Sequence, residues 1–224
     1  MQNRDGGWAA FEKNSDNTIL QNLPIESAED ALVDPSSADL TGRTLEFFGT
    51  FAGMKWKHPS IQAAVDWLLA NQEKNGSWYG KWGVCYIYGT WAAVTGMRAV
   101  GIPASHPAIQ KAVNWLKEIQ HSTGGWGESC KSPEIKQYVP LSFSTPSQTA
   151  WAVDAIISVY DEEDEAIERG IQFLLIAKSL SEDMLTYPTG TGRPGQFYIN
   201  YHSYNYIFPL LTLTHYRNKF HKLT

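Results

Sequence analysis

The sequence of 224 residues has few cysteines, few charged residues and no long apolar run. Its two cysteines, Cys85 and Cys130, lack metal-ligand spacing. We expect reduced thiols in a cytoplasmic protein, although such a pair could form one disulfide in a secreted protein. No window reaches the ~18 apolar residues of a membrane-spanning helix, and the polar stretch MQNRDGGWAAFEK is no signal peptide. The histidines also lack metal-ligand spacing, so the sequence predicts no metal and no cofactor.

Charge is low and spread without long runs of one sign, with 18 Lys and Arg against 23 Asp and Glu. A nucleic-acid partner favours a basic patch, so the sequence predicts no nucleic-acid binding. Aromatic residues, in contrast, are abundant, with nine Trp and eleven Tyr. This abundance is typical of a large core or of a cavity lined with rings. The length fits one domain or two small ones, and is sufficient to bury a sizeable core.

Three segments align without gaps, at 58–78, 106–126 and 164–184, and the first two match closely. Both of these end in the pattern Gln-x-x-x-Gly-x-Trp, and a partial copy of the pattern occurs at the N-terminus. The glutamines and tryptophans of the pattern are Gln2, Trp8, Gln72, Trp78, Gln120 and Trp126. The third segment keeps the apolar spacing but has lost the pattern residues. The chain is therefore predicted to be an array of helical repeats.

Each repeat has the spacing of an amphipathic helix that ends in a glycine. The His-Pro pair at 58–59 places proline in the first turn, where its missing N–H costs nothing. We expect Asn75-Gly76 to end this helix, because glycine adopts the left-handed cap. Gln72 is predicted to hydrogen-bond the backbone at a neighbouring helix end, and Trp78 to cover that junction. The repeat glutamines and tryptophans are thus predicted to be structural.

A second, more apolar helix follows each repeat tail, with predicted ranges 40–54, 86–100, 147–160 and 201–216. Alternating amphipathic and apolar helices predict two concentric layers. The predicted fold is therefore all-α, an α/α toroid in the form of an incomplete α/α barrel, with a flat solenoid as the alternative. No strand pattern is evident. Two loops, 14–38 and 128–146, are longer than simple connections need, which favours a functional role.

The stretch PTGTGRPGQFYINYHSYNYIFP at 188–209 has its glycines first and its aromatic residues second. Phe197, Tyr201 and Tyr204 lie at i, i+4 and i+7, so in a helix they would form one stripe. Asp39 and Arg43 are four residues apart and would share a helical face. Ordinary core packing and an ordinary helix pair are alternatives to a functional site in both cases.

Five segments, in this order, resemble the triterpene cyclases, above all the bacterial squalene–hopene cyclases. They are DPSSADLTGRTLEFFG (34–49), NGSWYGKWGVCYIYGTW (75–91), GGWGESC (124–130), STPSQTAWA (144–152) and GTGRPGQFYINYHSYNYIFP (190–209). The resemblance implies that residues 1–224 are the C-terminal part of a cyclase's catalytic barrel domain. In that family an Asp-x-Asp-Asp-Thr acid protonates squalene, and ring faces stabilise the carbocations that lead to hopene-type pentacycles. That acid motif is absent from this sequence, so we expect the chain alone to cyclise nothing.

The resemblance assigns roles to individual residues. Asp39, Arg43 and Tyr88 match positions that support the acid. Positions that line the substrate cavity are matched by Phe11, Trp82, Phe197, Tyr201 and Tyr204. Arg43 replaces a usual His, Arg193 a common aromatic residue, and Phe11 a common Tyr. These departures favour, as an alternative substrate, the tetraprenyl-β-curcumene of sesquarterpene cyclases.

The implied partners are a polyprenyl lipid, the missing N-terminal part of the cyclase and, in a homodimer, a second copy of the chain. The implied location is the cytoplasmic side of a bacterial cell membrane, as a peripheral protein. Two other functions stay open: an inactive lipid-binding or scaffold remnant, and another toroid enzyme such as a glycosidase. Protein prenyltransferase subunits form toroids too, but they need zinc ligands that we do not find.

Overall fold

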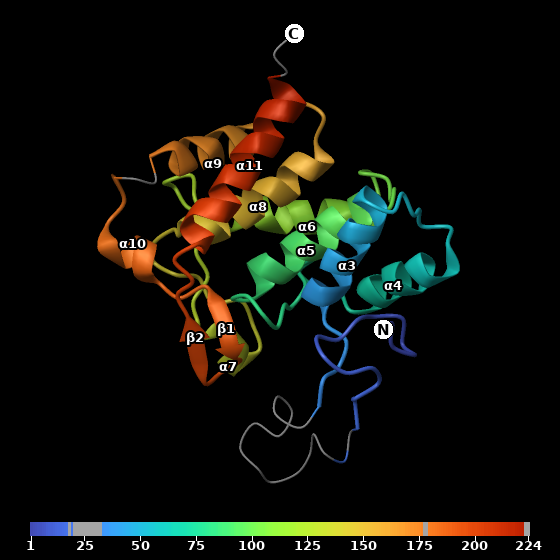
Figure 1. Cartoon of the computed structure of the whole chain (residues 1–224). Coiled ribbons are helices and arrows are strands. Elements are labelled where there is room, and N and C mark those ends of the chain that lie inside the picture. The colour runs from blue at the N-terminus through green and yellow to red at the C-terminus, as the bar shows by residue number, and fades with distance from the viewer. Residues whose placement is uncertain (18, 20–32, 177–178, 222–224) are drawn as a thin grey trace.

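The computed structural model describes residues 1–17, 19, 33–176 and 179–221, so part of the predicted loop 14–38 lies outside it. Its helices are α3 (Ala38–Thr50), α4 (Pro59–Ala70), α5 (Tyr86–Ala99), α6 (Pro107–Glu118), α7 (Ser132–Ile135), α8 (Pro146–Val159), α9 (Glu165–Leu175), α10 (Glu182–Thr186) and α11 (Tyr204–Phe220) (Figure 1). Two short strands, β1 (Gly190–Arg193) and β2 (Phe197–Ile199), pair antiparallel.

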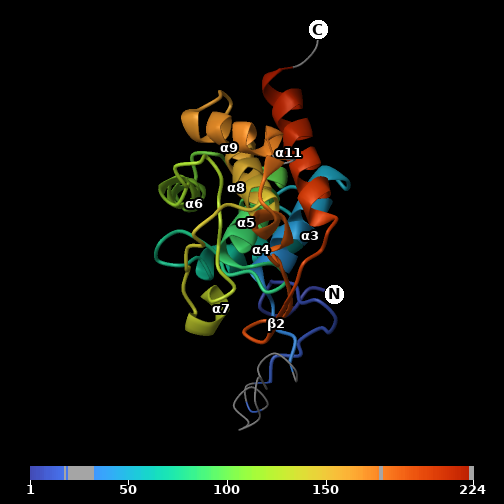
Figure 2. The ribbon, with the colours of Figure 1, turned by 90° about the vertical axis from the view of Figure 1, so that its left-hand side faces the viewer.

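The long helices lie in two layers. α3, α5, α8 and α11 form a row in which each helix packs on the next. Figure 2 shows α6 and α9 on one side of this row, where they contact α8. The amphipathic repeats thus form the outer layer and the more apolar helices the inner layer. This arrangement confirms the predicted α/α toroid, of which the described residues form an arc.

The middle of the inner row is almost completely buried, because helices cover α5 and α8 on both sides. α3 and α5 approach each other closely, and this approach depends on glycine. A Cβ atom added to Gly42 would lie 2.2 Å from the carbonyl oxygen of Ala92. One added to Gly96 would lie 2.2 Å from the carbonyl oxygen of Gly42. The small residues in the predicted inner helices therefore set the spacing of the row.

The repeat glutamines make the predicted contacts with neighbouring helices. Gln72 Nε2 donates to the carbonyl oxygen of Gly76 and to that of Ala108 in the first turn of α6, both at 2.8 Å. Gln2 and Gln120 make the same two kinds of bond in their own repeats. Each glutamine thus joins its own turn to the start of the next outer helix.

Trp78 and Trp126 are anchored by both of their N–H groups, and Trp8 by its backbone N–H. The indole N–H of Trp78 donates to Leu68 in the preceding helix at 2.7 Å, and that of Trp126 makes the equivalent bond. The backbone N–H of Trp8, Trp78 and Trp126 donates to a threonine of the following inner helix. These threonines are Thr41, Thr90 and Thr149. The backbone contacts predicted for the repeat glutamines are present, and the threonines are an addition that sequence reasoning missed.

The predicted end of the first complete repeat helix is wrong. α4 ends at Ala70, and Asn71 caps it through a bond from its side chain to the carbonyl oxygen of Trp67. Gly76 lies in the following turn with φ 101°. A Cβ there would lie 2.6 Å from the carbonyl oxygen of Lys111 in α6. This glycine therefore allows the turn to touch α6, rather than ending α4.

The absence of strands and the helical aromatic stripe were also wrong predictions. Phe197 lies in β2, Tyr201 follows it, and only Tyr204 is in α11. A turn with Gly195 at φ 73° reverses the chain between the strands. The aromatic rings cover the glycines of β1, since a Cβ on Gly192 would lie 2.0 Å from the Phe197 ring. Glycine and aromatic residues in this stretch thus pack as partners across a hairpin.

Candidate active site

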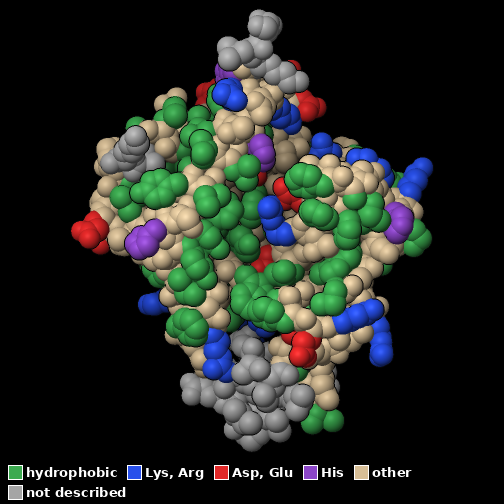
Figure 3. Space-filling model, in the orientation of Figure 1, with side chains coloured by type: hydrophobic (Ala, Val, Ile, Leu, Met, Phe, Trp, Pro, Cys, Tyr) green, Lys and Arg blue, Asp and Glu red, His purple; other side chains and the backbone are tan. Residues whose placement is uncertain are grey.

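Five aromatic rings meet on the face of the inner row that lies away from the outer helices. The rings, called here the ring wall, are Tyr88, Trp91, Trp151, Tyr204 and Phe208. Trp151 is central, with centroid distances of 4.7 Å to Tyr88, 6.2 Å to Trp91, 6.1 Å to Tyr204 and 5.2 Å to Phe208. Figure 3 shows hydrophobic side chains gathered along the middle of this face.

The structure brings some of the predicted residues into this wall and leaves others out. Tyr88 and Tyr204 belong to it, and Tyr201 extends it with a centroid distance of 4.8 Å to Tyr204. Phe197 is 55% exposed and covers Gly192. The ring wall therefore includes two of the predicted residues and is extended by a third.

Phe11 and Trp82 form a second aromatic pair, at 5.4 Å and edge to face. They line a pocket of about 350 Å³ together with Lys81 and Arg193. Arg193 thus lies beside two of the predicted cavity residues. Asp34 fixes the backbone around Phe11 in this pocket, because its carboxylate accepts hydrogen bonds from the backbone N–H groups of residues 10–12.

Sequence reasoning missed Trp91, Trp151 and Phe208, which complete the ring wall. Two of them follow a predicted site residue at helical spacing. Trp91 lies three residues after Tyr88, and Phe208 lies four residues after Tyr204. Neighbours at these spacings share a helix face, so the signal was present in the sequence. Trp151 had no such neighbour, and its central place follows only from the packing of α8.

Asp39 is fully buried, and its Oδ2 accepts the backbone N–H of Lys81 at 3.1 Å and of Trp82 at 2.8 Å. It therefore fixes the loop that presents Trp82. Burial raises the pKa of Asp39, and these bonds oppose the rise. A hydrogen bond from the Ser37 hydroxyl also opposes the rise in the pKa of Asp39. Asp39 Oδ1 makes no hydrogen bond with any described residue. A buried carboxylate oxygen without a hydrogen-bond partner can accept a hydrogen bond from a further donor.

Tyr88 lies near this carboxyl group. Burial raises the pKa of the Tyr88 hydroxyl, and the charge of Asp39 adds to the rise. The hydroxyl therefore stays protonated at neutral pH and can act as a hydrogen-bond donor. Asp39 and Tyr88 thus form the polar end of the ring wall.

Arg43 does not form the predicted pair with Asp39. Its Nη1 bonds Glu46 instead, and its guanidinium carbon lies 4.5 Å above the Trp91 ring. Glu46 also accepts a bond from the Thr95 hydroxyl at 3.1 Å. Because loop amides already bind Asp39, the guanidinium turns along α3 toward the next carboxylate. The carboxylate that pairs with Arg43 is therefore Glu46.

Glu128, a second buried acid, holds the helix that carries Tyr88 and Trp91. Its carboxylate accepts the backbone N–H groups of Cys85, Tyr86 and Ile87 at 2.9–3.0 Å. Burial raises the pKa of Glu128, and these three bonds oppose the rise. Carboxylates are favourable at helix N-termini, so Glu128 caps α5 from a distant loop.

The site offers aromatic faces and few nucleophiles, which suits a positively charged hydrocarbon intermediate. Each ring face attracts a cation by ~0.5–2 kcal/mol and forms no bond with it.

Among the described residues, no group of three or more His, Cys, Asp or Glu side chains could hold a metal ion. Within the same residues, no helix is both long and apolar enough to cross a bilayer.

Inner and outer helix layers with a ring-lined inner face define a toroid of the terpene-cyclase class. The solved structure of ent-copalyl diphosphate synthase from Streptomyces platensis matches 81% of the chain with a TM-score of 0.61. The match covers 33% of that structure at 20% identity, and so shows the fold alone. The family described as squalene-hopene cyclase C-terminal domain matches residues 1–218. The chain belongs to this family, which decides against a glycosidase.

Three curated relatives are more similar to the chain in sequence than the solved structure is. Sporulenol synthase of Bacillus subtilis (strain 168) is 61% identical over the whole chain, which covers 35% of that protein. The squalene–hopene cyclases of Alicyclobacillus acidocaldarius and Zymomonas mobilis are 46% and 44% identical over 97% of the chain, which covers 34% and 33% of their lengths. The chain therefore spans about a third of the length of these relatives.

Proposed function

We propose that the chain is the C-terminal part of a cyclase that closes rings in a polyprenyl lipid through carbocations. The observation that carries this proposal is the ring wall around Trp151, one member of which, Tyr88, interacts electrostatically with the buried carboxyl group of Asp39. The names of the relatives, squalene–hopene cyclase and sporulenol synthase, support the same reaction class.

Each part of the site has a task in this reaction. The ring wall excludes water and stabilises positive charge through its π faces. Asp39 Oδ1 accepts a hydrogen bond from a donor that lies beside the protonating acid, so the acid keeps its own proton for the alkene, and the Tyr88 hydroxyl donates a hydrogen bond nearby. In this proposal, the longer protein supplies the acid. Phe11 and Trp82 line the adjoining pocket and hold a further part of the lipid.

We propose tetraprenyl-β-curcumene as the substrate, with squalene second. The higher identity to sporulenol synthase, 61% against 44–46% for two squalene–hopene cyclases, favours the first. Arg193 supports the same choice, since a cation beside Phe11 and Trp82 disfavours positive charge there. A substrate whose carbocations avoid that pocket would suit the site better.

The test is turnover by the full-length protein that carries this chain. Purified protein in detergent would be incubated with each lipid, and the extracts analysed by gas chromatography with mass spectrometry. We expect cyclic product from tetraprenyl-β-curcumene, less from squalene, and none from residues 1–224 alone. A folded full-length protein that binds both lipids but converts neither would contradict the proposal and favour a lipid-binding remnant.

We propose that the rest of the cyclase binds at the edges of the inner row. Phe47 and Phe51 on α3 are 56% and 78% exposed, and Tyr206 and Leu210 on α11 are 74% and 67% exposed. Apolar side chains on both edge helices suit further helices that close the toroid. Peripheral attachment to the cytoplasmic side of the cell membrane and a homodimer remain proposals. Vesicle flotation and light scattering of the full-length protein would test them.

A further inference from the structure

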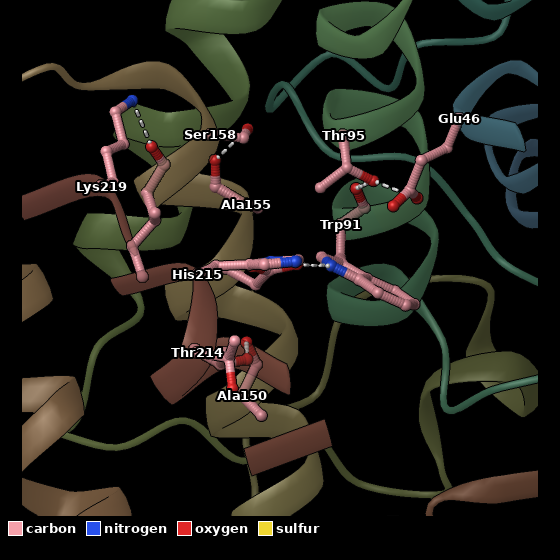
Figure 4. Close-up of polar contacts among 12 residues, drawn as sticks. Glu46, Trp91, Thr95, Ala150, Ala155, Ser158, Thr214, His215 and Lys219 are labelled. Carbon is pink, nitrogen blue, oxygen red and sulfur yellow. Dashed lines mark hydrogen bonds and ion pairs between the residues drawn. The ribbon is translucent and has the colours of Figure 1, made fainter. Parts of the chain in front are cut away.

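A buried carboxylate connects the ring wall to a polar cluster on α11. Asp154 on α8 is 3% exposed. Its Oδ2 accepts the indole N–H of Trp91 at 2.8 Å, and its Oδ1 lies 2.7 Å from His215 Nδ1. In Figure 4 the side chains of His215 and Trp91 point toward one another from α11 and α5. One carboxylate thus joins three helices of the inner row.

The Trp91 ring is also held on its faces. The guanidinium group of Arg43 lies 4.5 Å from its centroid. Trp151 lies 6.2 Å away and nearly parallel, at 23°, while Phe208 meets the ring edge to face at 5.5 Å. Because Trp151 contacts every other member of the ring wall, the angle of Trp91 affects the whole wall.

We propose that Asp154 is a positioning residue of the cyclase, which fixes the indole of Trp91 and thereby the central ring Trp151. This inference rests on the proposed function. His215 completes the arrangement by orienting the carboxylate from the other side. Glu46, Lys219 and Arg98 line the pocket of about 350 Å³ beside this pair.

A carboxylate suits this task for two reasons. It has an acceptor oxygen for each of two donors, so it can bind Trp91 and His215 at once. A charged acceptor also gives a shorter and stronger bond than a neutral one, which holds the ring against rotation. A leucine of similar size would leave the indole N–H buried without an acceptor.

The test compares variants of the full-length protein by product ratio, kcat/KM and the NMR signal of the Trp91 indole N–H. Loss of one signal in Trp91→Phe assigns it. We expect Asp154→Leu to move that signal, to lower kcat/KM about 10- to 100-fold and to raise the share of partly cyclised product. Asp154→Asn retains an oxygen for Trp91, and is expected to restore most of the wild-type product ratio.

The matched control is Thr212→Val, which removes another buried bond between α11 and α8. The Thr212 hydroxyl donates to the carbonyl oxygen of Ala150 at 3.0 Å. This variant should lower stability and leave the product ratio unchanged. Equal changes of product ratio in Thr212→Val and Asp154→Leu would reduce Asp154 to a structural role and overturn the inference.

A double-mutant cycle decides the matter if Asp154→Leu does not fold. Asp154→Ala removes both acceptor oxygens and should change the product ratio of the wild-type protein, but in the Trp91→Phe background it should change the ratio no further, because Asp154 acts through the indole N–H. Additive effects would overturn the inference. If the wild-type protein converts neither lipid, the proposed function fails. The indole signal then still reports whether Asp154 holds Trp91, because it needs no turnover.

Discussion

Tryptophan has two different environments in the two layers of this protein. In the repeats, Trp78 and Trp126 are fully buried, and each donates its indole N–H to the carbonyl of a residue ten positions earlier. In the inner row, Trp91 donates to the distant Asp154. The indole N–H of Trp151 is buried and meets no acceptor among the described residues.

The difference separates rings that close local turns from rings that pack on the rings of other helices. A repeat tryptophan satisfies the backbone of its own unit, so its position follows from its neighbours in sequence. An inner tryptophan is placed by other helices and contributes its aromatic face. A buried N–H without an acceptor costs about 1–3 kcal/mol, so the position of Trp151 carries a cost in stability that its ring contacts must offset. The two kinds of tryptophan are therefore expected to respond differently to substitution.

The largest expected loss of stability comes from the repeat layer. Trp78→Ala should lower the free energy of unfolding by about 3–5 kcal/mol, because it opens a cavity between two outer helices and their turn. Chemical denaturation followed by circular dichroism would measure it. Trp56→Ala is a suitable control, since Trp56 is 40% exposed. A loss below that of the control would show that the repeat ring is not a structural clamp.

A substitution at the centre of the wall should affect turnover as well as stability, because Trp151 is fully buried. Trp151→Leu removes a π face, which predicts a fall of about 2- to 30-fold in kcat/KM of the full-length protein. Trp151→Phe keeps an aromatic face and should recover much of that loss. Trp78→Phe, as the matched change in the repeats, should leave kcat/KM unchanged in the fraction that folds. Equal kinetic losses for the Phe and Leu variants of Trp151 would remove the argument for its π face.

The same contrast explains how much the sequence could predict. The repeat glutamines and tryptophans were predicted with their structural role, because each acts within one repeat or on the next. The two layers followed from the change in apolar pattern between successive helices. These features depend on spacing, which a single sequence displays.

The inner site was predicted only in part. Tyr88 and Tyr204 belong to the ring wall, but Trp151 and Asp154 gave no local signal, because their partners lie on other helices. The spacing of Phe197 fits one helical stripe with Tyr201 and Tyr204, whereas the turn at Gly195 and the glycines of β1 favour the hairpin that is present. The Asp39–Arg43 pair is absent: Asp39 accepts the backbone N–H groups of the loop at 81–82, and Arg43 bonds Glu46.

The smallest expected effect is a pH-dependent one at the edge of the wall. Hydrogen bonding to Asp154 raises the pKa of His215 above its usual 6.5, against the opposing effects of burial and of Arg43, while the charge of Glu46 adds to the rise. A raised pKa means that protonated His215 stabilises the fold fully below about pH 6.5, and that this contribution is lost as pH rises through the raised value. Because the His215 side chain is 43% exposed, solvent limits the contribution to under ~1 kcal/mol.

His215→Gln should therefore lower the free energy of unfolding more at pH 6 than at pH 9, as measured by urea denaturation. Asp154→Asn removes the same ion pair from the other side and should abolish the same pH-dependent part. An equal loss from His215→Gln at both pH values would mean that imidazole packing, rather than charge, holds the carboxylate beside Trp91. Asp154 would then position the Trp91 ring by its hydrogen bond alone, without a contribution from the charge of His215. The repeat tryptophans are positioned in a similar way, by hydrogen bonds to backbone carbonyls.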